Sequence, residues 1–175
     1  MTNKFDKLLS DLDVLGKMDY TKKGFYISVK FVNKSTNPNP EYAKEMDSGF
    51  DLRANLLDGD VVIKPLERKL IPTGLYFNLP ENYELQVRSR SGLALKNGIM
   101  VLNSPGTVDN RYSGEVCVIL CNISNEDFTV SHGDRVAQGV LSPISSTNIM
   151  KLVQVSEIID NNVRSSNGFG STGIK

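Results

Sequence analysis

The most informative stretch of this chain reads Asn103-Ser-Pro-Gly-Thr-Val-Asp-Asn-Arg-Tyr-Ser-Gly-Glu-Val-Cys-Val-Ile-Leu-Cys121. Its second half, residues 115–121, is rich in β-branched residues and too short for an isolated helix, which favours a strand. Its first half contains Pro-Gly, Asp-Asn and Ser-Gly pairs, whose residues set or tolerate the backbone angles of turns. We therefore expect a tight hairpin that presents its backbone, the Asp109 carboxylate and the Tyr112 ring. Such a hairpin can hold a flat polar ligand and place the Asp109 carboxylate beside it as a proton acceptor.

The size and charge of the chain narrow the class of protein. Its 175 residues suit one domain whose core needs no disulfide or metal. Lysine and arginine together number 20, as do aspartate and glutamate, so no net field draws the chain toward nucleic acid or a membrane. No apolar run has the length of a membrane span, and the charged beginning does not resemble a signal peptide. We expect a cytoplasmic protein that contacts neither nucleic acid nor membrane directly.

The cysteines and the single histidine offer little chemistry of their own. Cys117 and Cys121 lie on one expected strand with Cα atoms about 13 Å apart, which is too far for a disulfide. One histidine supplies no ligand set for structural zinc. We expect both cysteines to be small core hydrophobes. His132 lies in a Ser-His-Gly-Asp turn without a nucleophile motif, so we expect no catalytic role for it.

Short strands separated by turn residues dominate the chain after residue 25. Residues 25–32 alternate, with Ile27, Val29 and Phe31 on one face. Only residues 92–97 favour a helix in this region. Further strands are expected at residues 50–54, 61–63, 69–72, 74–79, 83–88, 99–102, 115–122, 128–130 and 135–143. Strands this short and evenly spaced predict an all-β sandwich, jelly roll or barrel.

The two ends of the chain differ from this β region. Residues 3–15 carry five apolar side chains at helical spacing, which predicts a short helix that docks on the body or on a protein partner. The tail is rich in glycine and serine, and composition alone favours a disordered terminus there. Its single aromatic, Phe169, lies between two glycines and resembles a stacking platform in phosphate-binding backbone. We expect three parts: a helix and linker over 1–24, a β core over 25–160 and a flexible arm over 161–175.

Four further segments pair charged residues with glycine and hydroxyl groups. They are residues 47–54, 88–96, 133–138 and the tail. Arg-Ser-Arg-Ser-Gly, at residues 88–92, has the ingredients of an anion-binding nest: backbone N–H, hydroxyl and guanidinium donors. Each segment taken singly is a weak signal, since a Gly-Asp-Arg turn is more often an ordinary salt-bridged turn. Their order around the Asp109 stretch is a much stronger one.

In this order the five segments resemble the motifs of the trimeric deoxyuridine triphosphatase (dUTP diphosphatase, dUTPase) family, over about residues 25–173. The most specific are Gly106-Thr-Val-Asp-Asn-Arg-Tyr-Ser-Gly-Glu115 and Gly168-Phe-Gly-Ser-Thr-Gly173. The resemblance implies a jelly-roll-like fold with an extra N-terminal helix. It implies a homotrimer whose sites are each built from three subunits, with the C-terminal arm swapped over the ligand. The implied reaction is hydrolysis of dUTP to dUMP and pyrophosphate, which limits uracil incorporation into DNA and supplies dUMP for thymidylate synthesis.

The resemblance also implies a role for each motif. Asp51 would help to place Mg²⁺ through its water shell. Asp109 would contact the sugar 3′-hydroxyl and orient the water that attacks the α-phosphate, while Tyr112 would pack beneath the deoxyribose. The phosphate chain would be held by Arg90, Ser91, Gly92 and Gln138, and the uracil edge read by Asn103 and the backbone of Gly106, Thr107 and Val108. The arm would supply Arg164, Ser171 and Thr172 for the terminal phosphate, and Phe169 with Gly170 over the base.

The chemistry is also consistent in its own terms. Attack at the α-phosphate needs an in-line water, a base to orient it and positive charge on the developing oxygens. One carboxylate, a magnesium ion and a few arginines meet that need without a covalent nucleophile. A backbone that pairs with uracil rejects cytosine, because swapped donors and acceptors leave buried polar groups unsatisfied. From the resemblance we expect thymine to be excluded at its 5-methyl group and ribose by Tyr112.

Three residues depart from the family pattern. Ser165 and Asn167 stand where the family usually has glycine, which predicts an arm that closes less readily. Gly139 stands where the family usually has a bulky apolar residue, and we expect it to loosen its strand.

Two other functions are weighed against this one. The related dCTP deaminases share the fold and the phosphate loop, but in them a glutamate serves the reaction, whereas here the hairpin carries Asp109 and the tail Phe169. A nucleotide sensor would bind dUTP in the same pocket and contact a partner through the N-terminal helix. The intact acid and phosphate clasp favour the enzyme over a sensor.

Overall fold

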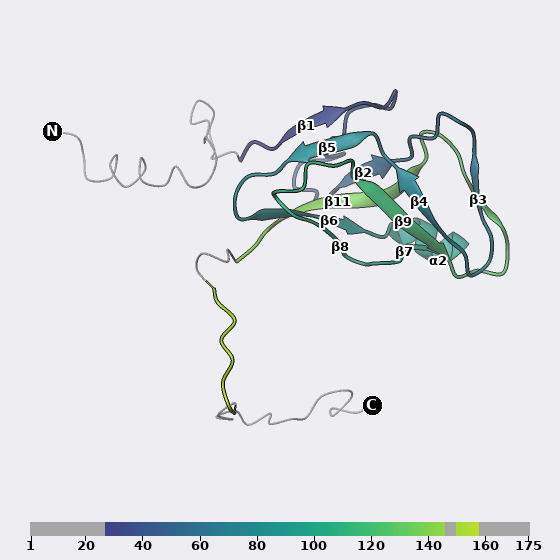
Figure 1. Cartoon of the computed structure of the whole chain (residues 1–175). Coiled ribbons are helices and arrows are strands. Elements are labelled where there is room, and N and C mark those ends of the chain that lie inside the picture. Colours follow the sequence, from purple (N-terminus) through teal and green to yellow (C-terminus); the bar gives the residue numbers. More distant parts are fainter. Residues whose placement is uncertain (1–26, 146–149, 158–175) are drawn as a thin grey trace. The chain divides into compact units, whose positions relative to one another are not determined.

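The computed structural model describes residues 27–145 and 150–157 (Figure 1). The chain divides into two compact units, residues 1–144 and residues 145–175, which are described separately. The helix expected near the start of the chain lies outside the described residues. The same is true of the C-terminal arm from residue 158 onward.

Short strands make up the first unit, and the all-β class predicted from the sequence is confirmed. The strands are β1 Lys30–Asn33, β2 Phe50–Arg53, β3 Val61–Ile63, β4 Arg68–Pro72, β5 Leu75–Asn78, β6 Tyr83–Arg88, β7 Ile99–Val101, β8 Gly106–Val108, β9 Cys117–Asn122, β10 Phe128–Val130 and β11 Arg135–Pro143. The one helix among the described residues is α2, Ser91–Asn97, where the sequence predicts it. It ends at Gly98, whose φ of 63° is the left-handed conformation that glycine adopts at helix ends.

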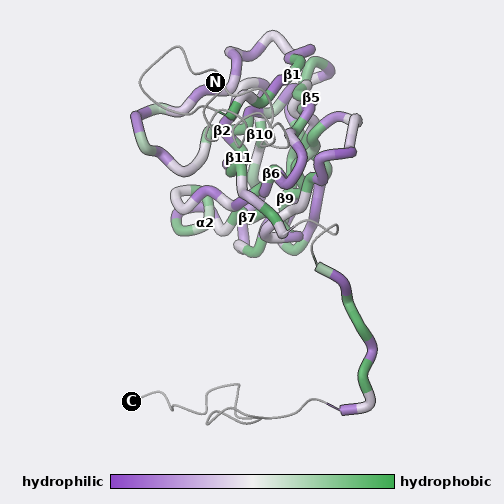
Figure 2. The backbone as a smooth tube through the Cα atoms, turned by 90° about the vertical axis from the view of Figure 1, so that its left-hand side faces the viewer, coloured by the Kyte–Doolittle hydropathy of each residue, from purple (hydrophilic) through white to green (hydrophobic). Residues whose placement is uncertain are grey.

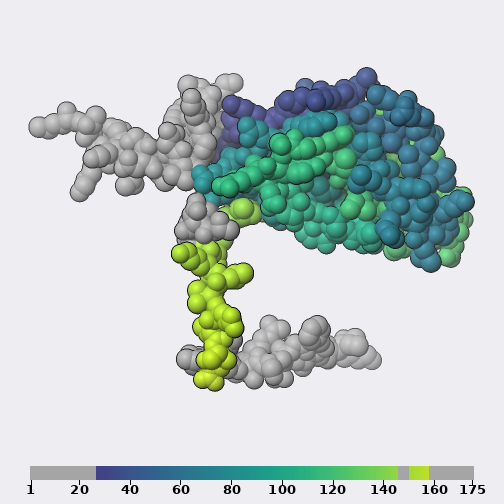
Figure 3. Space-filling view, in the orientation of Figure 1, coloured from purple at the N-terminus to yellow at the C-terminus, as the bar shows by residue number. Residues whose placement is uncertain are grey.

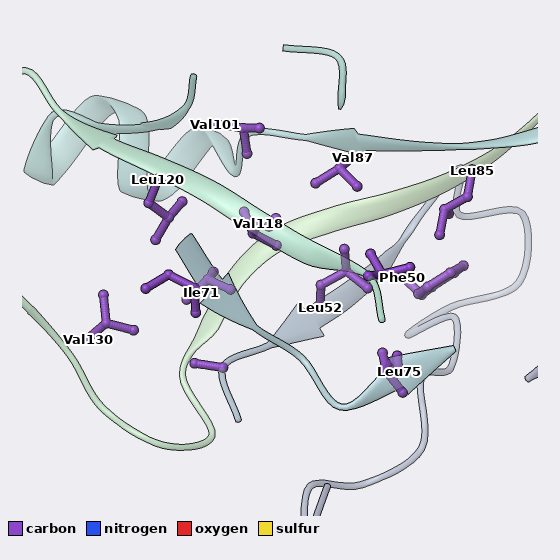
Figure 4. Packing of buried hydrophobic residues seen from close by; sticks show 14 of the residues in the cluster. Phe50, Leu52, Ile71, Leu75, Leu85, Val87, Val101, Val118, Leu120 and Val130 are labelled. Atoms are coloured by element: carbon purple, nitrogen blue, oxygen red, sulfur yellow. The ribbon is translucent and has the colours of Figure 1, made fainter. Parts of the chain in front are cut away.

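Two larger sheets, with strand orders β2-β11-β6-β8 and β4-β9-β7, share one hydrophobic core. Figure 4 shows Ile71, Val118 and Leu120 of the three-stranded sheet near Leu52 and Val87 of the four-stranded sheet. None of these five side chains is more than 3% exposed. In Figure 2 the apolar residues gather in the strands, while the loops between them are largely polar. Burial of alternate residues along each strand therefore fixes which face of each sheet turns inward.

The prediction of a tight hairpin around Asp109 is wrong. The strand β8, which no sequence pattern predicts, pairs with β6, whereas β9 pairs with β4 and β7. Residues 109–116, here called the crossing turn, thus carry the chain from one sheet to the other instead of joining two paired strands. The reason is a contact distant in sequence: the N–H of Val116 donates to the carbonyl of Leu75 over 2.8 Å, which draws the chain toward the β4–β5 connection.

Two further expectations need correction. Cys117 and Cys121 are free thiols, as expected, but they are half-buried on the outward face of β9. Val118 and Leu120 take the core positions between and beside them, because side chains alternate along a strand. Gly139 does not loosen β11, which pairs regularly on both sides there, with Phe50 and Val87. The Phe50 ring fills the space of the missing side chain, since a Cβ at Gly139 would lie 2.7 Å from its Cε2.

One edge of the first unit is formed by β1, which lies beside β5 (Figures 1 and 3). The other side of β1 has no strand partner within the described residues. Within the second unit, residues 150–157 form no helix or strand and carry both apolar and polar side chains (Figure 2). Leu152, Val153 and Val155 are 106%, 74% and 56% exposed. Among the helices described, none is long and apolar enough to cross a membrane.

Candidate active site

Asp51 lies at the centre of a group of charged side chains, here called the guanidinium cluster: Asp51, Arg90 and Arg135. Its Oδ1 accepts a hydrogen bond from Arg90 Nε over 3.0 Å, and its Oδ2 lies 3.4 Å from Arg135 Nη1. Arg90 also donates through Nη1 to the carbonyl of Arg135 over 3.0 Å. The side chains of Asp51 and Arg90 are only 26% and 24% exposed, so the carboxylate holds the guanidinium in one orientation. Positive charge exceeds negative here, which suits a polyanion.

Sheet register brings the other expected phosphate ligands to this cluster. Gln138 pairs with Asp51 on one side and with Arg88 on the other, so three neighbouring strands meet at one level. Arg90 follows β6 in an extended conformation, and Ser91 and Gly92 are exposed at the start of α2. The sequence prediction that these five residues (Asp51, Arg90, Ser91, Gly92 and Gln138) come together is therefore consistent with the geometry.

The other expected residues converge on a cavity of about 270 Å³, here called the Asp109 cavity. It is lined by Leu70, Asn103, Thr107, Val108, Asp109, Tyr112, Glu115, Val116, Cys117 and Ile119. Gly106 precedes Thr107 on β8 and packs closely against two neighbours: an added Cβ would meet Asn103 Nδ2 at 3.1 Å and Val87 Cβ at 3.2 Å. A side chain at Gly106 would therefore displace Asn103, so glycine preserves both the amide position and access to the β8 backbone.

The crossing turn is fixed by hydrogen bonds within itself and to the β4–β5 connection. Inside the turn, the N–H of Tyr112 donates to the carbonyl of Asp109 over 3.0 Å, and the Tyr112 hydroxyl donates to the carbonyl of Glu115 over 2.9 Å. The hydroxyl of Thr73, a residue that is 1% exposed, donates to the carbonyl of Val116 over 2.5 Å. These contacts leave the Asp109 side chain exposed at the cavity mouth, where it can accept a proton from water.

The sequence assigns no role to two titratable residues of this cavity, Glu115 and Cys117. Glu115 belongs to the quoted motif but receives no role from it; its carboxylate accepts a hydrogen bond from the N–H of Gly74 over 2.6 Å. Burial, and secondarily the negative charge of Glu115, raises the pKa of the Cys117 thiol. The thiol therefore stays protonated at neutral pH and contributes no anion to the cavity. No local signal in the sequence marks the Gly74 contact.

His132 has no free ring nitrogen for catalysis. Its Nδ1 accepts from the N–H of Leu56 over 3.1 Å, and its Nε2 lies 3.0 Å from the Thr36 hydroxyl. The ring joins two loops, one at Thr36 and one at Leu56.

A magnesium ion fits this chain only if phosphate and water supply its direct ligands. No group of three or more His, Cys, Asp or Glu side chains capable of holding a metal occurs within the described residues. Asp51 is a single carboxylate whose two oxygens already meet arginines. Each carboxylate oxygen still has a lone pair for a water molecule. The donor set thus fits an ion held by phosphate and water, with Asp51 contacting its water shell.

The guanidinium cluster and the Asp109 cavity are apart in one chain. Asp109 follows Val108, which pairs with Leu85, whereas Gln138 pairs with Arg88, three residues further along β6. At the rise of a strand this separates the two levels by about 10 Å. No residue of the guanidinium cluster lines the cavity. The expected arm residues Arg164, Phe169, Gly170, Ser171 and Thr172 lie outside the described residues.

The dUTPase family model matches residues 33–173. The deoxyuridine 5'-triphosphate nucleotidohydrolase of Finegoldia magna is 45% identical over 147 residues, which cover 84% of this chain and 99% of that protein. The enzyme of the same name from Cytophaga hutchinsonii is 48% identical over 152 residues, covering 87% of this chain and 96% of that protein.

Solved structures show the same fold. The dUTPase of Staphylococcus bacteriophage 80alpha, in a structure with dUPNHPP, has a TM-score of 0.73 and 24% identity, covering 84% of this chain and 99% of that chain. A point mutant of the dUTPase from phage phi11 of S. aureus, described with a structural Mg(II) ion, has a TM-score of 0.64 and 24% identity, covering 74% of this chain and 97% of that chain.

Proposed function

The chain belongs to the dUTPase family and hydrolyses dUTP to dUMP and pyrophosphate, and we propose that Asp109 and the guanidinium cluster of different subunits act together in each active site. The observation that carries this proposal is their separation in one chain. Among the residues that the structure describes, no arginine or lysine lines the Asp109 cavity, so the cavity supplies no cation for the phosphate oxygens. The guanidinium cluster that would supply one lies about 10 Å away along β6 in the same chain.

A homotrimer brings the two groups together. The family is trimeric, and in the second unit of this chain Met150, Leu152, Val153 and Val155 are exposed apolar side chains that are costly to leave in water. The first unit offers the side of β1 that has no strand partner within residues 27–145 and 150–157. Exposed strand edges readily accept a strand from another copy. We propose that trimer formation covers both, and that the arm beyond carries Arg164, Phe169, Gly170, Ser171 and Thr172 to a neighbouring site.

In the proposed site each group has one task. Asn103 and the backbone of Gly106, Thr107 and Val108 read the uracil edge, and Tyr112 packs on the deoxyribose. Asp109 accepts a hydrogen bond from the attacking water and aligns it with the α-phosphate. Because the uracil edge would meet the Asn103 amide and the β8 backbone, a base with the wrong donor pattern would leave polar groups unpaired.

The phosphate chain meets the guanidinium cluster. Arg90, Ser91, Gly92 and Gln138 donate to its oxygens, and Arg90 is already oriented by Asp51. The ion pair means that little side-chain freedom is lost when phosphate binds. Mg²⁺ would be held by the phosphates and, through water, by Asp51, and would neutralise charge that develops on the leaving pyrophosphate. The cytoplasmic location stays a prediction.

The test is pyrophosphate release with Mg²⁺ from dUTP, dCTP, dTTP and UTP, for the wild type and Asp109→Asn. We expect release from dUTP alone, and a loss of about 10³-fold or more in kcat for the variant, because asparagine cannot accept the proton. The variant should still bind dUTP. Ammonia release from dCTP would indicate a deaminase, and tight dUTP binding without turnover by the wild type would indicate a sensor.

A further inference from the structure

Tyr112 stands in an unusually open place for a residue that must recognise a sugar. It is 48% exposed, and it lines the Asp109 cavity on one side and a second cavity of about 550 Å³ on the other. The second cavity lies between the crossing turn and the β1–β5 pair, and Phe31 and Tyr76 form part of its wall. Packing on the core therefore does not hold the ring, which has room to turn away from the Asp109 cavity.

Two contacts hold the ring in place, and both involve the end of the crossing turn. The Tyr112 hydroxyl donates to the backbone carbonyl of Glu115 over 2.9 Å. The ring also lies against Gly114, where an added Cβ would come within 2.6 Å of Tyr112 Cζ. The position of the ring is thus set by the position of residues 114 and 115.

The Glu115 side chain in turn fixes that backbone. Its Oε1 accepts a hydrogen bond from the N–H of Gly74 over 2.6 Å. Gly74 is itself held in place, because its backbone at φ +71° packs so closely on Ser35 that an added Cβ would lie 2.7 Å from Ser35 Cβ. Its carbonyl is also bound by the N–H of Lys34 over 2.7 Å. A charge-assisted bond to a fixed backbone amide is a strong tether for a turn that belongs to neither sheet.

We infer that Glu115 is a positioning residue that holds Tyr112 against the sugar, and that it thereby sets the discrimination between deoxyribonucleotide and ribonucleotide. This inference rests on the proposed function, in which Tyr112 packs on deoxyribose. Glu115 does not touch the reacting atoms; it acts through its carbonyl on the tyrosine hydroxyl and through its carboxylate on Gly74. When the tether is lost, the ring turns toward the second cavity and leaves room for a 2′-hydroxyl.

Four substitutions test whether the length or the charge of the Glu115 side chain is what holds Tyr112 in place. Glu115→Gln keeps the length and an acceptor oxygen but removes the charge, whereas Glu115→Asp keeps the charge but is too short to reach Gly74. Glu115→Ala removes both, and Tyr112→Phe removes the hydroxyl end of the contact while leaving Glu115 intact. Glu67→Ala is the matched control, because Glu67 accepts a backbone N–H, that of Lys64 over 3.0 Å, in a turn outside the cavity.

The measurement is kcat and KM for dUTP and for UTP, with thermal unfolding of each trimer alongside. We expect the ratio of kcat/KM for dUTP to that for UTP to fall by about tenfold in Glu115→Ala, Glu115→Asp and Tyr112→Phe. Glu115→Gln should stay within about threefold of the wild type, and Glu67→Ala should match it. The comparison of Gln with Asp remains decisive if the alanine variant does not fold.

The inference is overturned if Glu115→Asp keeps the wild-type ratio while folding normally, or if Glu115→Gln loses it as fully as alanine does. Failure of the proposed function gives a different result. In that case the wild type itself does not prefer dUTP over UTP, and the variants have no discrimination to lose.

Discussion

Asp51 lies on β2 opposite Gln138 of β11, a strand that is paired on both sides. Asp109, in contrast, lies on a turn that belongs to neither sheet. The guanidinium cluster around Asp51 follows from sheet register and from ion pairs of 3.0 and 3.4 Å. The Asp109 cavity depends on hydrogen bonds from Thr73 and Gly74 to residues 115 and 116. In the proposed site, phosphate recognition would thus rest on paired strands, while base and sugar recognition would depend on tethers distant in sequence.

Apart from Asp109→Asn, the largest expected effect comes from the guanidinium cluster. Arg90→Ala removes a phosphate donor and leaves Asp51 paired with Arg135 alone, so kcat/KM for dUTP should fall by about 10²-fold. Thermal stability should change little, because the cluster is partly exposed. Arg88→Ala is the control: Arg88 is exposed and its side chain donates to Gln86. An equal loss of activity in Arg88→Ala would show that position within the cluster does not matter.

A smaller effect is expected at Gly139, which follows Gln138 on β11. Gly139→Val places a Cβ 2.7 Å from the Phe50 ring, and should lower the free energy of unfolding by about 2 kcal/mol. Urea unfolding of the variant measures this cost. Phe50→Leu in the same chain makes room, so the double variant should recover part of the loss. If the unfolding free-energy losses of Gly139→Val and Phe50→Leu simply add in the double variant, contact with Phe50 is not the cause of the Gly139→Val loss.

The smallest effect is expected at the crossing turn. Thr73→Val leaves the buried carbonyl of Val116 without its donor, and should cost about 1–2 kcal/mol of unfolding free energy. KM for dUTP should also rise, since the turn that carries Tyr112 is less firmly held. Thr129→Val on β10 is exposed and serves as the control for urea unfolding and kinetics. A stable Thr73→Val variant with wild-type KM would remove the contrast between turn and sheet.

What the sequence could predict follows the same division. Most strands and α2 follow from local patterns, because alternating burial shows itself residue by residue along a strand. The meeting of Asp51, Arg90 and Gln138 is expected only from the family resemblance, and sheet register brings their strands to one level. The three-residue strand β8 escapes prediction because Gly-Thr-Val lies among turn residues. The expected hairpin is wrong because the contact of Val116 with Leu75 leaves no local signal. The same holds for Gly139, whose partner ring lies on β2.

Glu115 illustrates the limit most clearly. Its place in the motif is evident, yet its task depends on Gly74, 41 residues earlier, being held at positive φ. Cys117 and Cys121 show a second limit of prediction from sequence. Alternation alone would place either set of β9 residues inward, and only the packing of Val118 and Leu120 decides it.

The most direct test of the central claim mixes two disabled subunits. Asp109→Asn and Arg90→Ala are denatured and refolded together, and pyrophosphate release from dUTP is compared with that of each variant refolded alone. If Asp109 and Arg90 act from different subunits, random mixing should leave about a quarter of the sites with both residues intact, and the mixture should regain about that fraction of wild-type activity. A mixture no more active than the separate variants would contradict the claim and place both residues in one subunit's site.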